Sequence, residues 1–257
     1  MLRMYLVQHG FNLADQACED ALLDSPSLRR FVGIDFSRER VPDATTLLEF
    51  RRLLEKHSLG EALFAEVGAV LQTHGMKVGT STIVDATLIS APSSTKNSDK
   101  ARDSEMHQTR KRKQRYLGMK PHIGVDSATG LAHSAVVTAA NVHDKHPLPD
   151  LLHGQEEFVY GDCACACQQD LFASKAPNAQ DLTNQRARKG SVTEGLDRMV
   201  NHAKSRVRAR VEHVFGVVKR LWGFGKVRYR GLAKNATRAF VALGWVNIYL
   251  ARKRLAA

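Results

Sequence analysis

A short strand-like stretch with a carboxylate in its middle constrains this fold more than any other feature of the sequence. Residues 82–88, with the sequence TIVDATL, are almost all β-branched or apolar, and Asp85 stands among them. Such a run predicts a strand of a buried sheet. A carboxylate is a poor strand former and is costly to bury without a partner. A bound metal ion that compensates its charge would explain an Asp85 buried in this strand.

The segment before this strand has the spacing of helices. Residues 1–74 place apolar side chains at helical intervals, with Asn12 or Asp15 as the cap of an early helix. Asp43 marks the start of a later helix, and Gly60 is expected at its end. We therefore expect a helical segment of 74 residues in front of the strand.

The pattern after residue 74 alternates between short strands and helices. Residues 92–115 are polar and charged and predict a loop, while 126–130 form a turn between two further strands. A short helix at 143–152, a strand at 157–162 and a long helix from about 201 complete the pattern. The order β-β-β-α-β-α, followed by more helix, predicts an α/β fold.

The charge of the chain points to a polyanionic partner. Its 257 residues carry a net charge of +12, and its pI is about 9.8. Residues 96–120 hold 9 Lys and Arg against 3 acidic residues, and residues 186–238 hold 15 against 3. Nucleic acid and an anionic membrane surface are the usual partners of such blocks.

Cysteine content and hydropathy favour a cytoplasmic protein. Three of the four cysteines, Cys163, Cys165 and Cys167, alternate too closely to pair with one another without strain, and the fourth is Cys18. The longest apolar run, at 239–251, is interrupted by Asn247 and is too short to span a bilayer. We therefore expect free thiols, a reducing compartment and no membrane partner.

Two further acids stand at positions comparable to that of Asp85. Asp162 ends the predicted strand at 157–162, although a turn or cap role is an equal alternative for it alone. Glu212 lies on the late helix beside an apolar stripe formed by Val207, Val211, Val214, Val218 and Leu221. Arg208 and Lys219 share its face, so an ion pair between Arg208 and Glu212 on a solvated surface is the competing interpretation.

Taken together, the three acids fit one chemistry. Two aspartates and a glutamate make an oxygen-only site, which suits hard divalent cations such as Mg²⁺. Two such ions would clamp the attacking and leaving oxygens of an in-line phosphoryl displacement. We therefore expect the carboxylates of Asp85, Asp162 and Glu212 to converge.

The sequence resembles bacterial insertion-sequence transposases of the DDE type, in the insertion-sequence-five-like group. The resemblance is carried by VDATLISAPSSTKN, MHQTRKRKQRYLGMKPHIGVD, TAANVHD, LPDLLHG, YGD and RARVEHVFGVVKR. It implies a ribonuclease-H-like mixed sheet flanked by helices over residues 75–257, preceded by a partial N-terminal helical region at 1–74. It also implies that Asp85, Asp162 and Glu212 are catalytic and hold two Mg²⁺ or Mn²⁺ ions.

The implied activity is metal-dependent DNA strand cleavage followed by strand transfer of an insertion sequence. The implied partners are double-stranded DNA, at transposon ends and target, and other copies of the chain assembled on DNA at the bacterial nucleoid. The expected DNA contacts are Arg208, Lys219, Lys111, Arg112, Lys113 and Arg115.

Three departures from the family pattern leave an alternative open. Met1 resembles an internal family position, so we expect the N-terminal region to be truncated. Cys165 stands where the family usually has a tyrosine. Related groups share the signature Tyr-x2-Arg-x3-Glu-x6-Lys on the helix of the glutamate, and Ser205 stands at its tyrosine position. The alternative is a catalytically inactive relative that only binds DNA or a full-length sibling. A third hypothesis is an unrelated metal-dependent hydrolase, in which the two basic blocks and the glutamate-helix motif would be coincidental.

Four other polar residues invite competing readings. His143, His146 and His153 have a helix-like spacing that is compatible with metal ligands, but we expect them to be polar residues around a loop and a short helix. Asp126 stands in the sequence VDSATG, and its neighbours predict a turn rather than a catalytic role.

Overall fold

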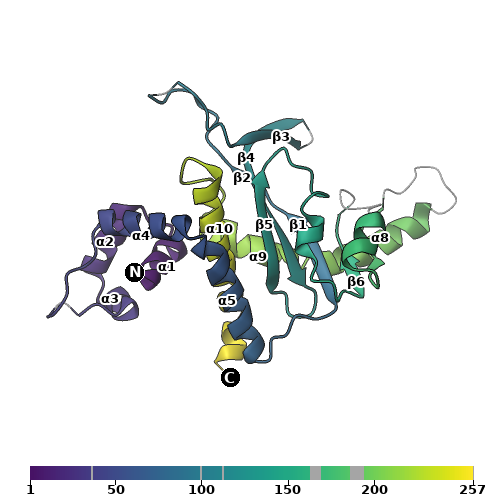
Figure 1. Cartoon of the computed structure of the whole chain (residues 1–257), viewed down its shortest axis with the longest axis horizontal. Helices are drawn as coiled ribbons and strands as arrows, with labels where there is room; N and C mark the ends of the chain where they lie inside the picture. The colour runs from purple at the N-terminus through teal and green to yellow at the C-terminus, as the bar shows by residue number, and fades with distance from the viewer. Residues whose placement is uncertain (36, 99, 112, 163–168, 186–193, 257) are drawn as a thin grey trace.

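The computed structural model describes residues 1–257 except 36, 99, 112, 163–168, 186–193 and 257. The N-terminal segment forms α1 (Leu2–Gly10), α2 (Asp15–Asp24), α3 (Pro26–Val32), α4 (Ala44–Lys56) and α5 (Leu59–Thr73). The expected helical content of this segment is confirmed. Helices α1 to α4 lie to one side of the sheet, with α5 and the last helix between them and the strands (Figure 1).

The predicted helix ends in this segment are partly right. Asp43 caps α4, because its carboxylate accepts a hydrogen bond from the Thr46 amide at 2.6 Å. Neither Asn12 nor Asp15 caps α2, whose N-cap is Ala14. Gly60 does not end α4 but lies inside α5, where an added Cβ would stand 3.0 Å from Thr237. A glycine there permits a close approach between two helices rather than a turn.

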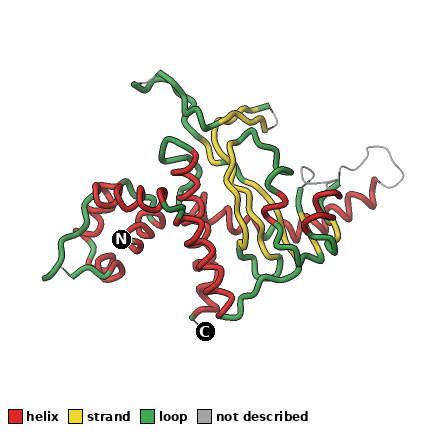
Figure 2. The backbone as a smooth tube through the Cα atoms, in the orientation of Figure 1, coloured by secondary structure: helices red, strands yellow, loops and turns green. Residues whose placement is uncertain are grey.

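One mixed sheet forms the centre of the remaining chain and is drawn in yellow in Figure 2. Its strands are β1 (Ser81–Ala86), β2 (Ile89–Ser90), β3 (His107–Lys111), β4 (Gln114–Asp126), β5 (Ala132–Ala139), β6 (Phe158–Tyr160) and β7 (Gln180–Asp181). The central strand β1 pairs with β4 antiparallel and with β6 in parallel. Beyond them, β5 runs antiparallel to β4, and β7 runs parallel to β6.

The basic segment 92–115 is a loop only in part. Its second half contains β3 and the start of β4, which pair antiparallel from His107↔Gly118 to Lys111↔Gln114. The hairpin projects from one end of the sheet (Figure 1). Its backbone ladder forms between mostly exposed polar residues, so the apolar alternation that reveals a strand in sequence is missing.

Side chains of β1 alternate between two cores. Ile83 packs on one face of the sheet with α9 (Val211–Gly216) and α10 (Leu232–Leu255). Val84 packs on the other face, with α6 (Leu148–Leu151) and with Phe172 of α7 (Gln169–Lys175). Successive side chains of a strand point to opposite faces, so Asp85 shares the face of Ile83.

The late helix is interrupted where one continuous helix was predicted. Helix α8 (Glu194–Arg208) ends before α9, and the amides of Glu212 and His213 bond back three residues to the carbonyls of Ala209 and Arg210 at 3.1 Å. A π-helical turn, η1 (Val217–Leu221), follows α9. The predicted apolar stripe is buried at Val211, Val214 and Val218 and half-buried at Val207, but Leu221 is 54% exposed and does not belong to it.

Helix α10 contains the apolar run and explains its one polar interruption. The buried Asn247 accepts a hydrogen bond from the Ala132 amide at 2.9 Å and donates to the Ala132 carbonyl at 2.7 Å. The side chain therefore fixes the helix to the start of β5. No described helix is both long and apolar enough to cross a membrane.

The turn predicted at 126–130 joins β4 to β5. The Asp126 carboxylate is buried and accepts from the Thr129 amide and hydroxyl at 2.6 Å, and from the Gly79 amide at 3.0 Å. The prediction that Asp126 is a turn residue is confirmed.

Candidate active site

A pocket of about 670 Å³ opens at the ends of the central strands and gathers charged side chains. Its acids come from β1, the segment after β6, the segment after β5, and α9. Its cations come from the β3 and β4 strands and from the α8–η1 region. The acids are Asp85, Asp162, Asp144 and Glu212; the cations are Arg110, Lys111, Lys120, Arg208, Lys219 and Arg220.

Strand register brings the two aspartates together. The parallel ladder between β1 and β6 ends at the pair Ile83↔Tyr160. Continuing that register by two residues places Asp85 beside Asp162, and both line the same pocket. Parallel neighbours end at the same edge of a sheet, so their terminal side chains meet there.

The Asp85 carboxylate is desolvated but not isolated. Its side chain is 14% exposed, it accepts a hydrogen bond from the Ala86 amide at 2.8 Å, and it forms an ion pair with Arg208. Burial raises the pKa of Asp85 to about 6, and the charges of Asp162 and Glu212 act in the same direction. Arg208 and the amide bond oppose that rise.

Arg208 places a positive charge beside Asp85, a pairing that the sequence did not predict. It stands at the end of α8 and reaches across to β1, so its ion-pair partner is Asp85 rather than Glu212, four residues ahead. The interruption after α8 explains why helical spacing suggested the wrong partner. The buried Nε of Arg208 has no hydrogen-bond partner among the described residues.

Glu212 and Lys219 reach the pocket from α9 and from the π-helical turn. Glu212 is exposed in the first turn of α9, and Lys219 is half-buried in η1. Burial lowers the pKa of Lys219, and the nearby Lys111 lowers it further, while Glu212 acts in the opposite direction. Lys111 belongs to β3, so the hairpin brings a cation to the pocket edge next to Lys219.

Two further cations predicted to contact DNA lie on the hairpin. Lys113 and Arg115 are exposed between and within its strands. Arg112, also predicted as a DNA contact, lies outside the described residues. Arg110, at the start of the same basic run, lines the pocket.

The sequence did not predict a cluster formed by Asp144, Lys120 and His122, on the side of the pocket opposite Arg208. Asp144 forms an ion pair with Lys120 at 2.8 Å and stands 3.7 Å from His122 Nδ1. Burial lowers the pKa of His122 to about 4, although Asp144 opposes that fall. The motifs MKPHIGVD and TAANVHD contain these residues, but neither has a spacing that indicates a shared site.

The donor set fits hard divalent cations, although the acids do not form a closed cluster. Carboxylate oxygens are the ligands that Mg²⁺ and Mn²⁺ take in proteins. Within the described residues, no group of three or more His, Cys, Asp or Glu side chains is placed to hold a metal ion. Arg208 contributes one positive charge beside Asp85. Closer convergence of the three acids therefore stays a prediction.

The other candidate ligands do not join this site. His143 and His146 are exposed in the turns before α6, and His153 lies 3.4 Å from the buried Glu156. Their interpretation as polar residues around a loop and a short helix agrees with these positions. Cys163, Cys165 and Cys167 lie outside the described residues, and Cys18 is a buried free thiol.

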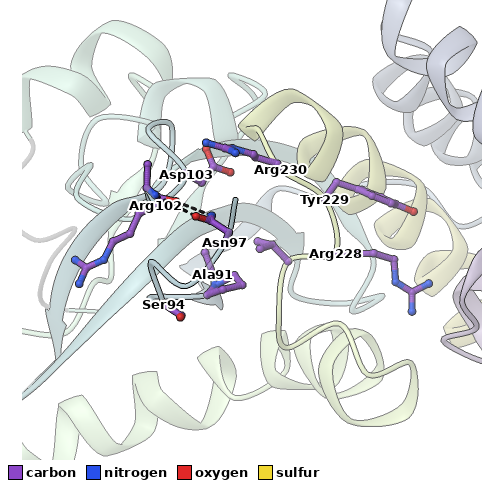
Figure 3. A pocket seen from close by; sticks show the side chains of 11 residues that line it. Ala91, Ser94, Asn97, Arg102, Asp103, Arg228, Tyr229 and Arg230 are labelled. Carbon is purple, nitrogen blue, oxygen red and sulfur yellow. Dashed lines mark hydrogen bonds between the residues drawn. The ribbon is translucent and has the colours of Figure 1, made fainter. Parts of the chain in front are cut away.

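A second pocket, of about 220 Å³, lies between residues 91–103 and residues 227–230 (Figure 3). The Arg228 and Tyr229 side chains extend away from it, toward the N-terminal helices. Arg228 donates to the Asn12 carbonyl at 3.0 Å, and Asp103 accepts from the Gly231 amide at 2.7 Å. These charged groups are engaged in holding the fold, so the first pocket is the better candidate.

Two family models match the chain. Residues 77–248 match the family described as the transposase DDE domain, and residues 1–53 match the family described as Transposase domain (DUF772). The first match spans most of the chain. The chain belongs to the DDE transposase domain family. This assigns it to the transposase class of enzymes, whose members act on DNA and generally use divalent metals. No solved structure gives a significant match.

The family match places the charged pocket inside the DDE transposase domain. Asp85, Asp162, Glu212 and Arg208 all fall within residues 77–248. The N-terminal match covers α1 to most of α4.

Proposed function

We propose that this transposase catalyses metal-dependent DNA strand cleavage and strand transfer of an insertion sequence at the carboxylate pocket. One observation carries the proposal: Asp85, Asp162 and Glu212, from three separate elements, line one pocket that is rimmed by cations. We place them as the catalytic acids of a ribonuclease-H-like domain over residues 75–257, in the insertion-sequence-five-like group, with residues 1–74 as a helical region. The strand order and directions around β1 support that fold.

In this proposal, Asp85, Asp162 and Glu212 hold two Mg²⁺ or Mn²⁺ ions. When bound, such ions stabilise the attacking and leaving oxygens of an in-line phosphoryl displacement. Arg208 and Lys219 position the DNA phosphate beside the acids, because both line the pocket from the helical side. The buried setting of Asp85 strengthens each of these electrostatic contacts.

The partner in this proposal is double-stranded DNA, both at transposon ends and at the target, in the nucleoid. The exposed cations Lys111, Lys113 and Arg115 on the hairpin extend the positive rim of the pocket and would contact the phosphate backbone. Arg112 belongs to the same basic run in sequence. We further propose that copies of the chain associate on DNA, since the two ends of an element must be brought together.

The test is a cleavage assay on linear duplex DNA that carries the element's own ends, with Mn²⁺ supplied. We expect Asp85→Asn, Asp162→Asn and Glu212→Gln each to lower the cleavage rate by at least about 10²-fold, because each removes transition-state stabilisation. DNA binding should persist in all three. Glu66→Gln, at an exposed position on α5, is the matched control. DNA binding without cleavage by the unmodified chain would favour the inactive relative instead.

A further inference from the structure

Among the cations of the pocket, Lys120 lies on the side opposite Arg208 and has two hydrogen-bond acceptors. Lys120 Nζ donates to the Val142 carbonyl at 2.6 Å and to Asp144 Oδ1 at 2.8 Å. The Lys120 side chain is 15% exposed and the Asp144 side chain 28% exposed. Both line the pocket that contains Asp85 and Asp162.

The register of β4 explains why this cation approaches from the other face. Ile123 and Met119 of β4 are buried in the core beneath α9 and α10, the face from which Arg208 comes. Lys120 alternates with them and therefore points to the α6 face. The backbone next to Lys120 adjoins the end of β1, since the Thr87 amide donates to the Pro121 carbonyl at 3.0 Å.

We propose that Lys120 is a further substrate-contacting residue, whose ammonium binds a non-bridging oxygen of the DNA phosphodiester at the carboxylate pocket, and that Asp144 is its positioning residue. This inference rests on the proposed function. An ammonium has three donors, and the Val142 carbonyl and Asp144 account for two. A phosphate in the pocket would then have cations on both sides, Lys120 from one face of the sheet and Arg208 from the other.

The rival role for Lys120 is purely structural. Its ion pair with Asp144 also links the segment after β5 to β4. Removing only one partner of a buried ion pair destabilises the folded protein strongly, because the other charge is left without a partner. Removing both charges relieves that cost. If the role of Lys120 is purely structural, the double variant should cleave DNA like wild type. If Lys120 contacts the phosphate, the double variant should stay slow.

The experiment compares Lys120→Met, Asp144→Asn, Lys120→Met/Asp144→Asn and Lys120→Arg in the full chain. The affinity of each variant for duplex DNA that carries the element's ends is measured at several salt concentrations. The buffer contains Ca²⁺ in place of Mg²⁺, because Ca²⁺ also takes oxygen ligands but with looser geometry. We expect Lys120→Met to reduce the slope of log affinity against log salt by about 1, the value of one phosphate contact. Asp144→Asn should keep that slope because the amide oxygen still accepts from the ammonium, and Lys120→Arg should keep it because the charge remains.

Cleavage and thermal unfolding complete the test. Lys120→Met should cut the cleavage rate by about 10²-fold, and the double variant should stay equally slow even where its unfolding temperature returns to the wild-type value. Lys253→Met, exposed near the end of α10, should change neither slope nor rate and is the matched control. An unchanged salt slope in Lys120→Met, or a double variant that cleaves like wild type, would overturn the inference. If Asp85→Asn cleaved normally, the proposed function would fail, whereas the Ca²⁺ slope reports on Lys120 alone.

Discussion

Arg208 and Asp85 form an ion pair that joins the end of α8 to β1, one residue before that strand ends. The pair neutralises a carboxylate that the fold has largely removed from water, and it occupies the group we propose as a metal ligand. Any cation that binds Asp85 must therefore compete with a guanidinium already in place. DNA phosphates offer that guanidinium another partner, so metal binding and DNA binding should be coupled through Arg208.

The first prediction follows from this competition. Arg208→Gln should bind Mn²⁺ more tightly than wild type in the absence of DNA, by about 10-fold within the usual range of coupling energies. Adding duplex DNA should raise the Mn²⁺ affinity of wild type but not of Arg208→Gln. The measurement is a Mn²⁺ titration followed by electron paramagnetic resonance, with thermal unfolding as the check on folding. Weaker Mn²⁺ binding by Arg208→Gln without DNA would contradict the prediction.

The second prediction concerns pH. The pKa of Asp85 rises in the folded protein from 3.8 to about 6, chiefly through burial. The folded state therefore holds a proton that the unfolded state has released between these values, so the free energy of unfolding falls as pH rises through this window. The loss should approach about 3 kcal/mol for a shift of this size.

Asp85→Asn isolates this contribution from other titrating groups. In metal-free buffer, the unfolding free energy of Asp85→Asn minus that of wild type should increase by about 2 kcal/mol from pH 4 to pH 7. Urea denaturation at each pH gives both values. A difference that stays constant with pH would show that Asp85 titrates normally in the folded chain.

The third prediction concerns the basic hairpin. Replacing Lys111, Lys113 and Arg115 together by Gln should weaken binding to all duplex sequences alike, since phosphate contacts carry no sequence information. The slope of log affinity against log salt should shrink by about 3, at roughly 0.9 per contact. The matched control replaces Arg252, Lys253 and Arg254, which are exposed at the opposite end of the molecule from the hairpin (Figure 1). Equal slopes for the two triple variants would exclude the hairpin as a DNA contact.

Local pattern was enough to predict the strand that contains Asp85 and the strand that precedes Asp162. The apolar run around Asp85 predicts β1, and the short apolar run before Asp162 predicts β6, because both runs are rich in β-branched or aromatic residues. Glu212 was placed on a late helix correctly. The partner of Arg208 was predicted wrongly. The helix is interrupted between Arg208 and Val211, so Arg208 pairs with Asp85 and not with Glu212.

Features that depend on distant pairing escaped the sequence. Strand β3 has charged and polar side chains on both faces, so only its backbone pairing with β4 reveals it. Lys120 and Asp144 are 24 residues apart on different elements, and no periodicity connects them. Both cases show sheet register, a property of long-range pairing, deciding which side chains reach the pocket.

The last prediction concerns the link between α10 and the sheet. The Asn247 amide satisfies both backbone groups of Ala132, at a point where the pairing of β4 with β5 shifts register between Gly124 and Val125. Asn247→Leu keeps the apolar character of the helix but leaves the Ala132 amide and carbonyl buried without partners. We expect it to lower the free energy of unfolding by about 2–4 kcal/mol, since each unsatisfied group costs about 1–3 kcal/mol. The urea midpoint should fall with no change in m-value, because the folded surface stays the same. Lys253→Leu, exposed six residues later on the same helix, should leave the midpoint nearly unchanged. A stable Asn247→Leu variant would mean that the start of β5 is held by its strand pairing alone.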